Sequence, residues 1–321
     1  MSNLIQKAVH ILKTGGLVAF PTETVYGLGA RLYDEKAIAK IFSVKGRPAD
    51  NPLIVHISNK KEIEILTRDL DSEAGKLIEK FWPGPLTLVC KRSKKVPLNV
   101  TAGLETVAVR MPKHPIALKL LRALGEPIAA PSANRSGRPS PTRYEDVMNE
   151  LGKDVDLVLS GGHTSLGLES TVVDVTVKPF HILREGFVTY EQLKKVVSVE
   201  APVGEAQKKI KTARSPGMKH QHYKPNCKVL LVEPKEWKKS LDHWMNEDYK
   251  LGLFSCSQKS PQNKKIVFAR HFKGDKLKFA RHIYSTFFDA EKEGVEVLLV
   301  ESMKPTGVGR AILDRLSRAS Q

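Results

Sequence analysis

Apolar and polar positions alternate along residues 1–200 with two periods, one typical of helices and one typical of strands. Leu4, Ala8, Ile11 and Leu12 form one face of a helix that Gly15-Gly16 can terminate. Short apolar runs predict strands at residues 17–20, 53–57, 86–89, 107–110, 128–130, 155–159, 171–175 and 180–183. Helical spacing predicts helices near residues 34–44, 71–81, 114–124 and 142–151. This mixture predicts an α/β domain built on a large twisted sheet.

The alternation breaks between about residue 198 and residue 226 and then resumes. The segment is polar, begins with Ala201-Pro202-Val203-Gly204 and ends in hydrogen-bonding and aromatic side chains, a composition that favours a functional linker. Beyond it, strands are predicted at residues 228–232, 251–255, 266–268 and 295–300, and helices near 235–246, 277–292 and 308–319. We therefore expect a first domain at 1–200, a linker at 201–226, and a small second α/β domain with parallel strands at 227–321.

The formal charge of +17 is concentrated in the second part of the chain. Residues 1–200 carry 28 Lys+Arg against 22 Asp+Glu, whereas residues 201–321 carry 24 against 13. This excess favours polyanionic partners such as nucleic acid or nucleotide phosphates, although a solvated lysine-rich surface explains the second domain equally well. No stretch approaches the ~20 apolar residues of a membrane span, and the three cysteines lack C-x-x-C spacing. We expect a cytoplasmic protein with reduced thiols and no membrane contact.

Three polar segments follow predicted strands or helices. Pro21–Gly29 places hydroxyls, a carboxylate and a phenol at the end of a strand, where open α/β sheets bind ligands, and its two glycines let the backbone approach a ligand closely. Lys45-Gly46-Arg47-Pro48 suits phosphate oxygens, or else complements a helix dipole. Pro131–Gly137 offers amides and hydroxyls to a nucleotide or a carboxylate. Neither a P-loop nor a G-x-G-x-x-G after a strand is present.

Single polar residues add to these segments. Arg110 and Arg184 each end a predicted strand, which suits a clamp for a carboxylate or a phosphate, or a surface ion pair. His56 lies on an otherwise apolar strand, where a histidine is more often a satisfied core residue than a ligand contact. His220-Gln221-His222 is a weak metal site because it lacks a third ligand.

Six ordered motifs resemble the YrdC-like family throughout residues 1–200. They are Pro21–Gly29, Lys45–Pro48 with Asn51-Pro52-Leu53, Phe81–Thr87, Val109–Pro112, Ser132-Ala133-Asn134 and Ser170-Thr171. Ser215–Lys219 with His222-Tyr223, followed by a second α/β domain, resembles the two-domain form of this family, the threonylcarbamoyl-AMP synthases. The resemblance implies a twisted mixed open sheet with flanking helices, a smaller Rossmann-like α/β C-terminal domain, and a linker at 201–226 that acts as an active-site lid.

The resemblance also implies a reaction. A nucleotidyltransferase of this family joins L-threonine, bicarbonate or CO2, and ATP into threonylcarbamoyl-AMP and releases pyrophosphate. The product serves threonylcarbamoyladenosine modification of tRNA reading ANN codons, so downstream threonylcarbamoyl transferase machinery is an implied partner, and direct tRNA contact is left open. Such chemistry needs positive charge on the phosphates rather than a protein nucleophile, with Mg2+ carried on the ATP phosphates and no dedicated protein cage.

The family's site residues map onto matching positions of this sequence. By resemblance, L-threonine is held by Thr24, His56, Arg110, Ala130 and Ser170, with Arg110 clamping its carboxylate. The implied ATP contacts are Arg47, Asn51, Thr106, Ser132, Ser140, Arg184 and Tyr223. Lys45 and Arg47 would supply electrostatic catalysis. Gln221 departs from the family pattern, in which a basic residue is frequent, and is left without a role.

Two other interpretations stay open at this point. A YrdC-like RNA-binding protein without catalysis predicts salt-sensitive tRNA binding and no dependence on threonine. A carbamoyl-transferring maturation enzyme shares the YrdC-like module but adds zinc-binding cysteine pairs, against which the three scattered cysteines argue. Polar residues at strand ends suit a small ligand better than the lysine-and-aromatic stripe expected for RNA.

Overall fold

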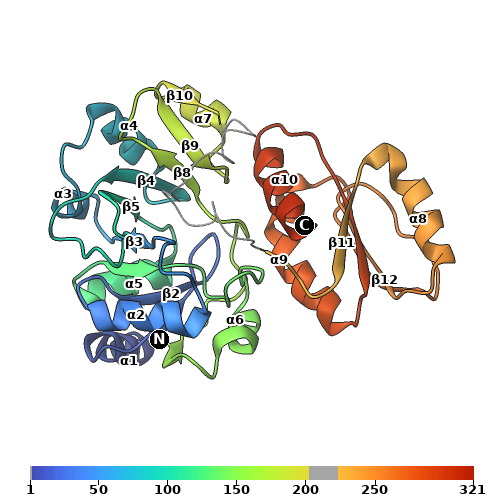
Figure 1. Cartoon of the computed structure of the whole chain (residues 1–321), viewed down its shortest axis with the longest axis horizontal. Helices are drawn as coiled ribbons and strands as arrows, with labels where there is room; N and C mark the ends of the chain where they lie inside the picture. Colours follow the sequence, from blue (N-terminus) through green and yellow to red (C-terminus); the bar gives the residue numbers. More distant parts are fainter. Residues whose placement is uncertain (1, 202–222) are drawn as a thin grey trace.

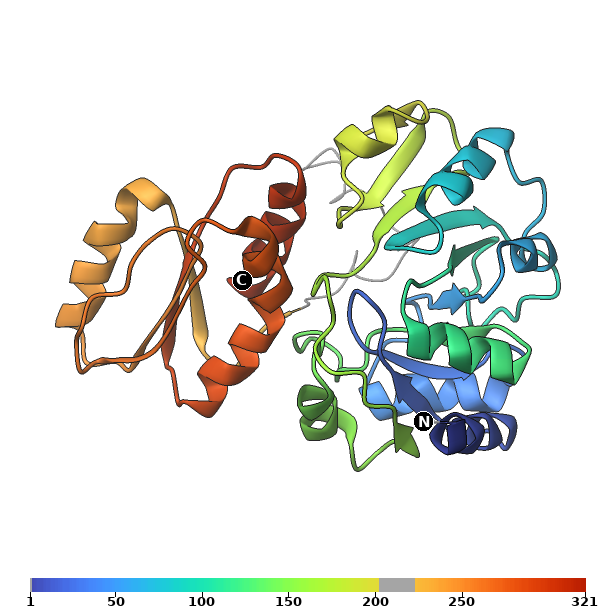
Figure 2. The same ribbon diagram turned by 180° about the vertical axis from the view of Figure 1, so that it is seen from behind.

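A computed structural model describes residues 2–201 and 223–321, and these form two α/β units. Each unit is built on its own sheet, and helices α9 and α10 of the second unit lie between the two sheets (Figures 1 and 2). In these described ranges, no helix is long and apolar enough to cross a membrane.

The first sheet contains ten strands within residues 2–201, in the order β10-β9-β8-β4-β5-β3-β6-β2-β1-β7. Their bounds are β1 Val18–Phe20, β2 Gly27–Arg31, β3 Ile54–His56, β4 Leu86–Lys91, β5 Thr106–Arg110, β6 Ile128–Ala130, β7 Leu157–Val158, β8 Thr171–Asp174, β9 Phe180–Arg184 and β10 Val199–Glu200. The helices are α1 Ser2–Lys13, α2 Glu35–Lys45, α3 Ile63–Leu66, α4 Ser72–Phe81, α5 Pro115–Leu124, α6 Tyr144–Leu151 and α7 Tyr190–Lys194. Parallel and antiparallel pairs both occur, which confirms the expected mixed sheet.

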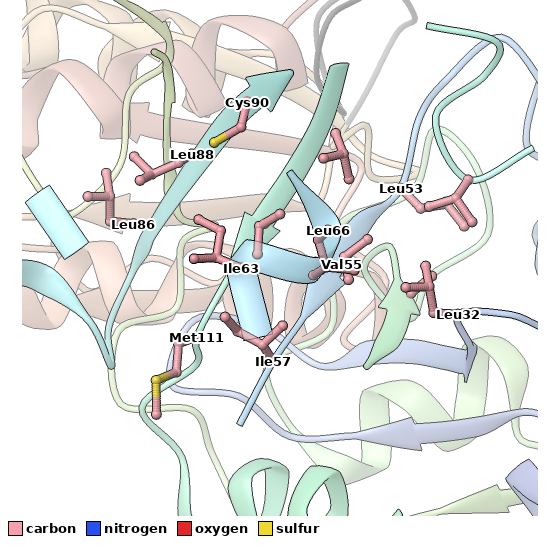
Figure 3. Close-up of a cluster of buried hydrophobic side chains, with 14 of the residues drawn as sticks. Leu32, Leu53, Val55, Ile57, Ile63, Leu66, Leu86, Leu88, Cys90 and Met111 are labelled. Atoms are coloured by element: carbon pink, nitrogen blue, oxygen red, sulfur yellow. The ribbon is translucent and has the colours of Figure 1, made fainter. Parts of the chain in front are cut away.

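Residue alternation along the central strands separates an apolar face of this sheet from a face that carries polar groups. Val55 of β3 and Leu88 of β4 belong to the main hydrophobic core (Figure 3). Apolar residues of α2, α3 and α4 cover this core. Successive side chains of a strand point to opposite faces, so His56 and Arg110 point away from this core. The parallel register of β3 and β5 pairs these two residues side by side. Helices α1 and α5 cover part of the second face, next to β1 and β6.

The second unit is a four-stranded parallel sheet within residues 223–321, in the order β11-β14-β12-β13. Its strands are β11 Lys228–Val232, β12 Leu251–Ser255, β13 Ile266–His271 and β14 Val297–Glu301. Helix α8 (Trp237–Asn246) packs on one face, and α9 (Lys276–Lys292) and α10 (Val308–Ala319) pack on the other. The parallel pairing confirms the prediction for this part of the chain.

The two units share a hydrophobic core. Val25 and Leu168 of the first unit pack with Ile283, Tyr284 and other apolar residues of α9 and α10. Arginine-mediated contacts add polar links across the same boundary, among them Arg138 to Glu291, Arg143 to Asp289, Arg310 to Glu185, and Arg281 to the Thr164 carbonyl.

Strand β2 was not predicted, because its Gly-Leu-Gly-Ala-Arg sequence has few of the β-branched and aromatic residues that mark strands. Its second glycine, Gly29, is also required for a different reason from the close approach to a ligand that was expected from the sequence. A Cβ atom on Gly29 would lie 2.7 Å from Ile128 Cγ2 and 2.8 Å from Phe20 Cε1, which is too close for any side chain. Gly29 is therefore required by packing within the sheet, whereas Gly27 lines a cavity.

Candidate active site

A cavity lies on the polar face of the first sheet and reaches the second unit. It gathers most of the predicted site residues, namely Thr24, Lys45, Arg47, His56, Arg110, Ala130, Ser132, Ser140, Ser170, Arg184 and Tyr223. The lining contains four Lys and Arg side chains and one carboxylate, that of Glu169. The cavity therefore suits an anionic ligand.

Arg110 is the centre of a buried polar cluster. Its Nη1 donates to Thr24 Oγ1 at 2.9 Å, its Nε donates to the Gly84 carbonyl at 3.3 Å, and its Nη2 forms a 2.7 Å ion pair with Glu23 Oε1. The Thr22 hydroxyl donates to the Val25 carbonyl, so the Thr24 hydroxyl donates to Thr22 Oγ1 and accepts from Arg110. Glu23, whose role the sequence left open, thus fixes the guanidinium.

His56 is neutral in this setting. Its Nδ1 lies 3.1 Å from the Ile54 carbonyl, which can only accept, so Nδ1 carries the proton. The ring is packed edge-on against Phe20. Burial, with the neighbouring Arg110 cation as a second cause, lowers the pKa of His56 to about 3. A neutral imidazole adds no further charge beside Arg110.

Lys45 connects the end of α2 to the predicted polar turn at 131–137. Asp34 caps the start of this helix and Gly46 ends it in the left-handed region (φ 58°), so that Lys45 and Arg47 leave the helix toward the cavity. Lys45 Nζ donates to the carbonyls of Ser132 and Asn134. Burial holds the pKa of Lys45 well below its usual value. In this arrangement Lys45 braces the turn as well as lining the cavity.

Arg47 and Arg184 approach the cavity from different elements. Arg47 donates to the carbonyls of Asn51 and Pro52. Arg184, at the end of β9, donates to the carbonyl and the hydroxyl of Ser170. Burial lowers the pKa of Arg47 to about 10, and the Arg184 cation contributes to the same shift. Two crowded guanidinium groups favour an anion between them.

Two predicted residues are not part of the lining. Thr106 begins β5, at the opposite end of the strand from Arg110, which separates the two by roughly 13 Å at about 3.3 Å per residue. Asn51 is buried next to Arg47, and neither atom of its side-chain amide has a hydrogen-bond partner among the described residues. A ligand that reached this amide would satisfy it.

Glu169 is the lining residue that the sequence missed. It lies in the loop before β8 and is buried. Its carboxylate accepts from Ser140 Oγ at 2.6 Å, Tyr284 Oη at 2.9 Å and Arg315 Nε at 3.0 Å. The nearby cations, Arg315 first, hold the pKa of Glu169 below its usual value despite the burial. No local pattern could reveal this role, because two of the partners lie more than a hundred residues away.

Of the predicted lid at 201–226 the structure describes residues 201 and 223–226, and Tyr223 is the predicted ATP contact among them. It is buried, adopts a left-handed backbone conformation (φ 70°) and packs against Tyr284 with ring centroids 5.3 Å apart. The linker motif Ser215–Lys219, together with Gln221 and His222, lies outside the described residues. The linker at 201–226 as a lid therefore stays a prediction.

Comparison with known proteins identifies the family. A domain family described as "Telomere recombination" matches residues 10–186, and one described as "Threonylcarbamoyl-AMP synthase, C-terminal domain" matches residues 188–321. The chain is 41% identical to the threonylcarbamoyl-AMP synthase of Pyrococcus abyssi, over 98% of this chain and 94% of the relative. It is 39% identical to that of Bacillus subtilis, over 98% and 92%. The chain belongs to the threonylcarbamoyl-AMP synthase family.

A solved structure agrees with this assignment. The crystal structure of Pyrococcus abyssi Sua5 complexed with L-threonine superposes with a TM-score of 0.91 at 39% identity, covering 98% of this chain and 94% of that one. The chain is therefore an adenylyl-transferring enzyme of a tRNA-modification family, and the interpretation as an RNA-binding protein without catalysis is not favoured.

In residues 2–201 and 223–321, no group of three His, Cys, Asp or Glu side chains is arranged to hold a metal ion. The carboxylate of Glu169 is already engaged by three side chains.

Proposed function

We propose that this chain joins L-threonine, bicarbonate and ATP into threonylcarbamoyl-AMP and releases pyrophosphate. The observation that carries the proposal is one cavity lined by two sets of polar residues, each suited to a different substrate. The first set is Arg110 with its partners and His56, which suits an amino acid. The second set is Arg47, Arg184 and Tyr223, which suits a nucleoside triphosphate. Family membership supports the reaction, and the Pyrococcus abyssi relative is complexed with L-threonine.

The amino-acid part of the site consists of Thr24, His56, Arg110, Ala130 and Ser170. Arg110 is held in place by Glu23 and Thr24, so its fork is already oriented before a carboxylate arrives. Neutral His56 lies beside it, and Ala130 leaves room for a small side chain. Ser170 bridges to the second part, because its hydroxyl contacts both Thr87 and Arg184.

The nucleotide part consists of Arg47, Asn51, Ser132, Ser140, Arg184 and Tyr223, with Thr106 farther along the sheet and Lys45 adding charge. Arg47 and Arg184 place two guanidinium groups on the phosphate region. The unpartnered Asn51 amide next to Arg47 gains hydrogen bonds when a phosphate oxygen reaches it. Mg2+ bound to ATP would screen the remaining charge of the phosphates.

The reaction needs orientation and positive charge rather than a protein nucleophile. The threonine nitrogen forms a bond to the bicarbonate carbon, and water leaves. An oxygen of the resulting N-carboxylate then attacks the α-phosphorus, and the bond to the bridging oxygen breaks so that pyrophosphate carries away the electron pair. The buried walls keep water from the labile N-carboxylate, and Lys45, Arg47 and Arg184 stabilise charge on the phosphates.

Further expectations about partners follow from this product. Threonylcarbamoyl-AMP is consumed by a threonylcarbamoyl transferase that acts on tRNA, which makes that machinery a proposed partner and the basic second unit a proposed tRNA contact. We also propose a cytoplasmic location. The three cysteines are free and buried, which agrees with a reducing compartment.

A pyrophosphate-release assay tests the proposal. Purified protein with Mg2+ and ATP is supplied with threonine and bicarbonate together, and then with each omitted in turn. We expect rapid release only when all the substrates are present. Release that does not depend on threonine would rule out the proposed reaction.

A further inference from the structure

Two side chains of the second unit hold residues of the cavity wall without lining the cavity themselves. Tyr284 lies on α9 and Arg315 on α10, and both are fully buried. Both donate hydrogen bonds to Glu169, whose other partner is the hydroxyl of Ser140. Glu169 and Ser140 line the cavity, so the second unit reaches the site through one carboxylate.

The same two residues also hold Tyr223. The Arg315 guanidinium lies over the Tyr223 ring at 5.7 Å from its centroid, and Tyr284 packs against the ring at 5.3 Å. Asp314 pairs with Arg315 at 2.8 Å and fixes its orientation. Tyr223 lines the cavity, as Glu169 does. Both of these lining residues are therefore held in place by α9 and α10, which follow the linker.

We propose that Tyr284 and Arg315 are positioning residues for the nucleotide part of the cavity, acting through Glu169 and Tyr223. The inference rests on the proposed function in assigning that part of the cavity to ATP. Neither residue lines the cavity itself. Through Tyr284 and Arg315, the second unit fixes the carboxylate that orients Ser140.

A purely structural role is the alternative, in which these residues only dock the two units. The other interfacial ion pairs allow the two roles to be separated. Asp289 lies on the same helix as Tyr284 and pairs across the boundary with Arg143, but neither residue lines the cavity. Asp289→Asn is therefore a matched control that weakens docking without touching the nucleotide part.

The experiment measures ATP affinity by calorimetry in the absence of threonine, so that it does not depend on turnover. Tyr284→Phe keeps the ring against Tyr223 and removes only the hydroxyl that donates to Glu169. We expect it to weaken ATP binding about tenfold, which is the effect of one hydrogen bond to a charged group. Asp289→Asn should bind ATP like the wild type. Threonine KM should change less than about twofold in both variants, because the amino-acid part is untouched.

A double variant tests the route through Glu169. In a Glu169→Gln background, adding Tyr284→Phe should weaken ATP binding by less than about twofold, since the group it acts on has lost its charge. Arg315→Lys keeps a charge but loses the fork, and should fall between wild type and Tyr284→Phe if it folds. If it does not fold, Tyr284→Phe still decides the question.

Three outcomes overturn the inference. They are wild-type ATP affinity in Tyr284→Phe, equal losses in Tyr284→Phe and Asp289→Asn, and full additivity with Glu169→Gln. Failure of the proposed function looks different, because wild-type protein would then bind ATP without threonine-dependent pyrophosphate release. Absence of ATP binding by the wild type would overturn both.

Discussion

Replacement of Arg110 by alanine should separate the use of threonine from the use of ATP. The guanidinium is only 3% exposed, and its three nitrogens contact Thr24, the Gly84 carbonyl and Glu23. A substrate carboxylate that loses a buried charged partner of this kind loses about 2–5 kcal/mol. At about 3 kcal/mol, the KM for threonine rises about 100-fold, since each 1.4 kcal/mol or so is a factor of ten. The KM for ATP should change less than about threefold.

The same substitution has a stability cost that must be distinguished from its effect on binding. Glu23 is 5% exposed and pairs with Arg110 at 2.7 Å, so Arg110→Ala leaves a buried carboxylate without its partner. Removal of one member of such a pair costs about 3–5 kcal/mol of unfolding free energy. The double variant Glu23→Gln/Arg110→Ala removes the unpaired charge. Its Tm should recover most of the loss, whereas its KM for threonine should stay high.

Steady-state pyrophosphate release at varied threonine and at varied ATP, together with thermal unfolding, gives all of these values. Arg68→Ala is the charge-matched control, because Arg68 is exposed and pairs with Glu105 far from the cavity. Equal loss of threonine and ATP use in Arg110→Ala would refute the assigned role. Recovery of threonine use in the double variant would show that Arg110 serves only the fold.

Three further predictions concern His56, the packing at Gly29 and the requirement for Mg2+. Burial lowers the pKa of His56 to about 3 from 6.5, so between these pH values the unfolded chain binds a proton that the folded chain does not, and stability falls as the pH decreases. His56→Gln should therefore reduce the slope of unfolding free energy against pH by up to about 1.4 kcal/mol per pH unit, measured by unfolding titrations at pH 4–7. Gly29→Ala should destabilise the protein by about 1–3 kcal/mol, because the new Cβ atom clashes with Phe20 and Ile128. Gly75→Ala is the control: its Cβ atom on α4 would meet nothing within 4 Å, and it should stabilise the protein by up to about 1 kcal/mol. Equal effects of the two substitutions in denaturant unfolding would contradict the packing argument. EDTA should abolish pyrophosphate release and excess Mg2+ should restore it, and activity that survived chelation would exclude the proposed metal role.

Local pattern was sufficient for most elements and for the residues at their ends. Apolar runs placed β3 and β5, and Arg110 ends its strand as predicted, whereas His56, which was predicted inside the strand at 53–57, is the last residue of β3. Their side-by-side register could not be read from the sequence, because strands fifty residues apart choose partners by global packing. Strand β2 was missed for a different reason. Packing requires a glycine at position 29, and a glycine lowers the strand propensity by which a strand is predicted from sequence.

The contribution of the second unit was also beyond local pattern. Its basic charge suggested a polyanion, but Tyr284 and Arg315 act on the cavity only through a lining carboxylate, to which both donate while fully buried. A buried arginine looks like a surface charge in the sequence alone, because only the fold shows that it is 0% exposed. Glu169 lies in the loop before β8, and two of its three partners come from helices that begin after residue 275.

The most direct test of the central claim is the identity of the product. The protein is incubated with Mg2+, ATP, threonine and isotope-labelled bicarbonate, and the nucleotides are separated and analysed by mass spectrometry. The proposed reaction predicts one new adenylate that contains threonine and the bicarbonate carbon, formed in equal amount with pyrophosphate. An adenylate that lacked the labelled carbon, or pyrophosphate formed without any threonine-containing nucleotide, would contradict it.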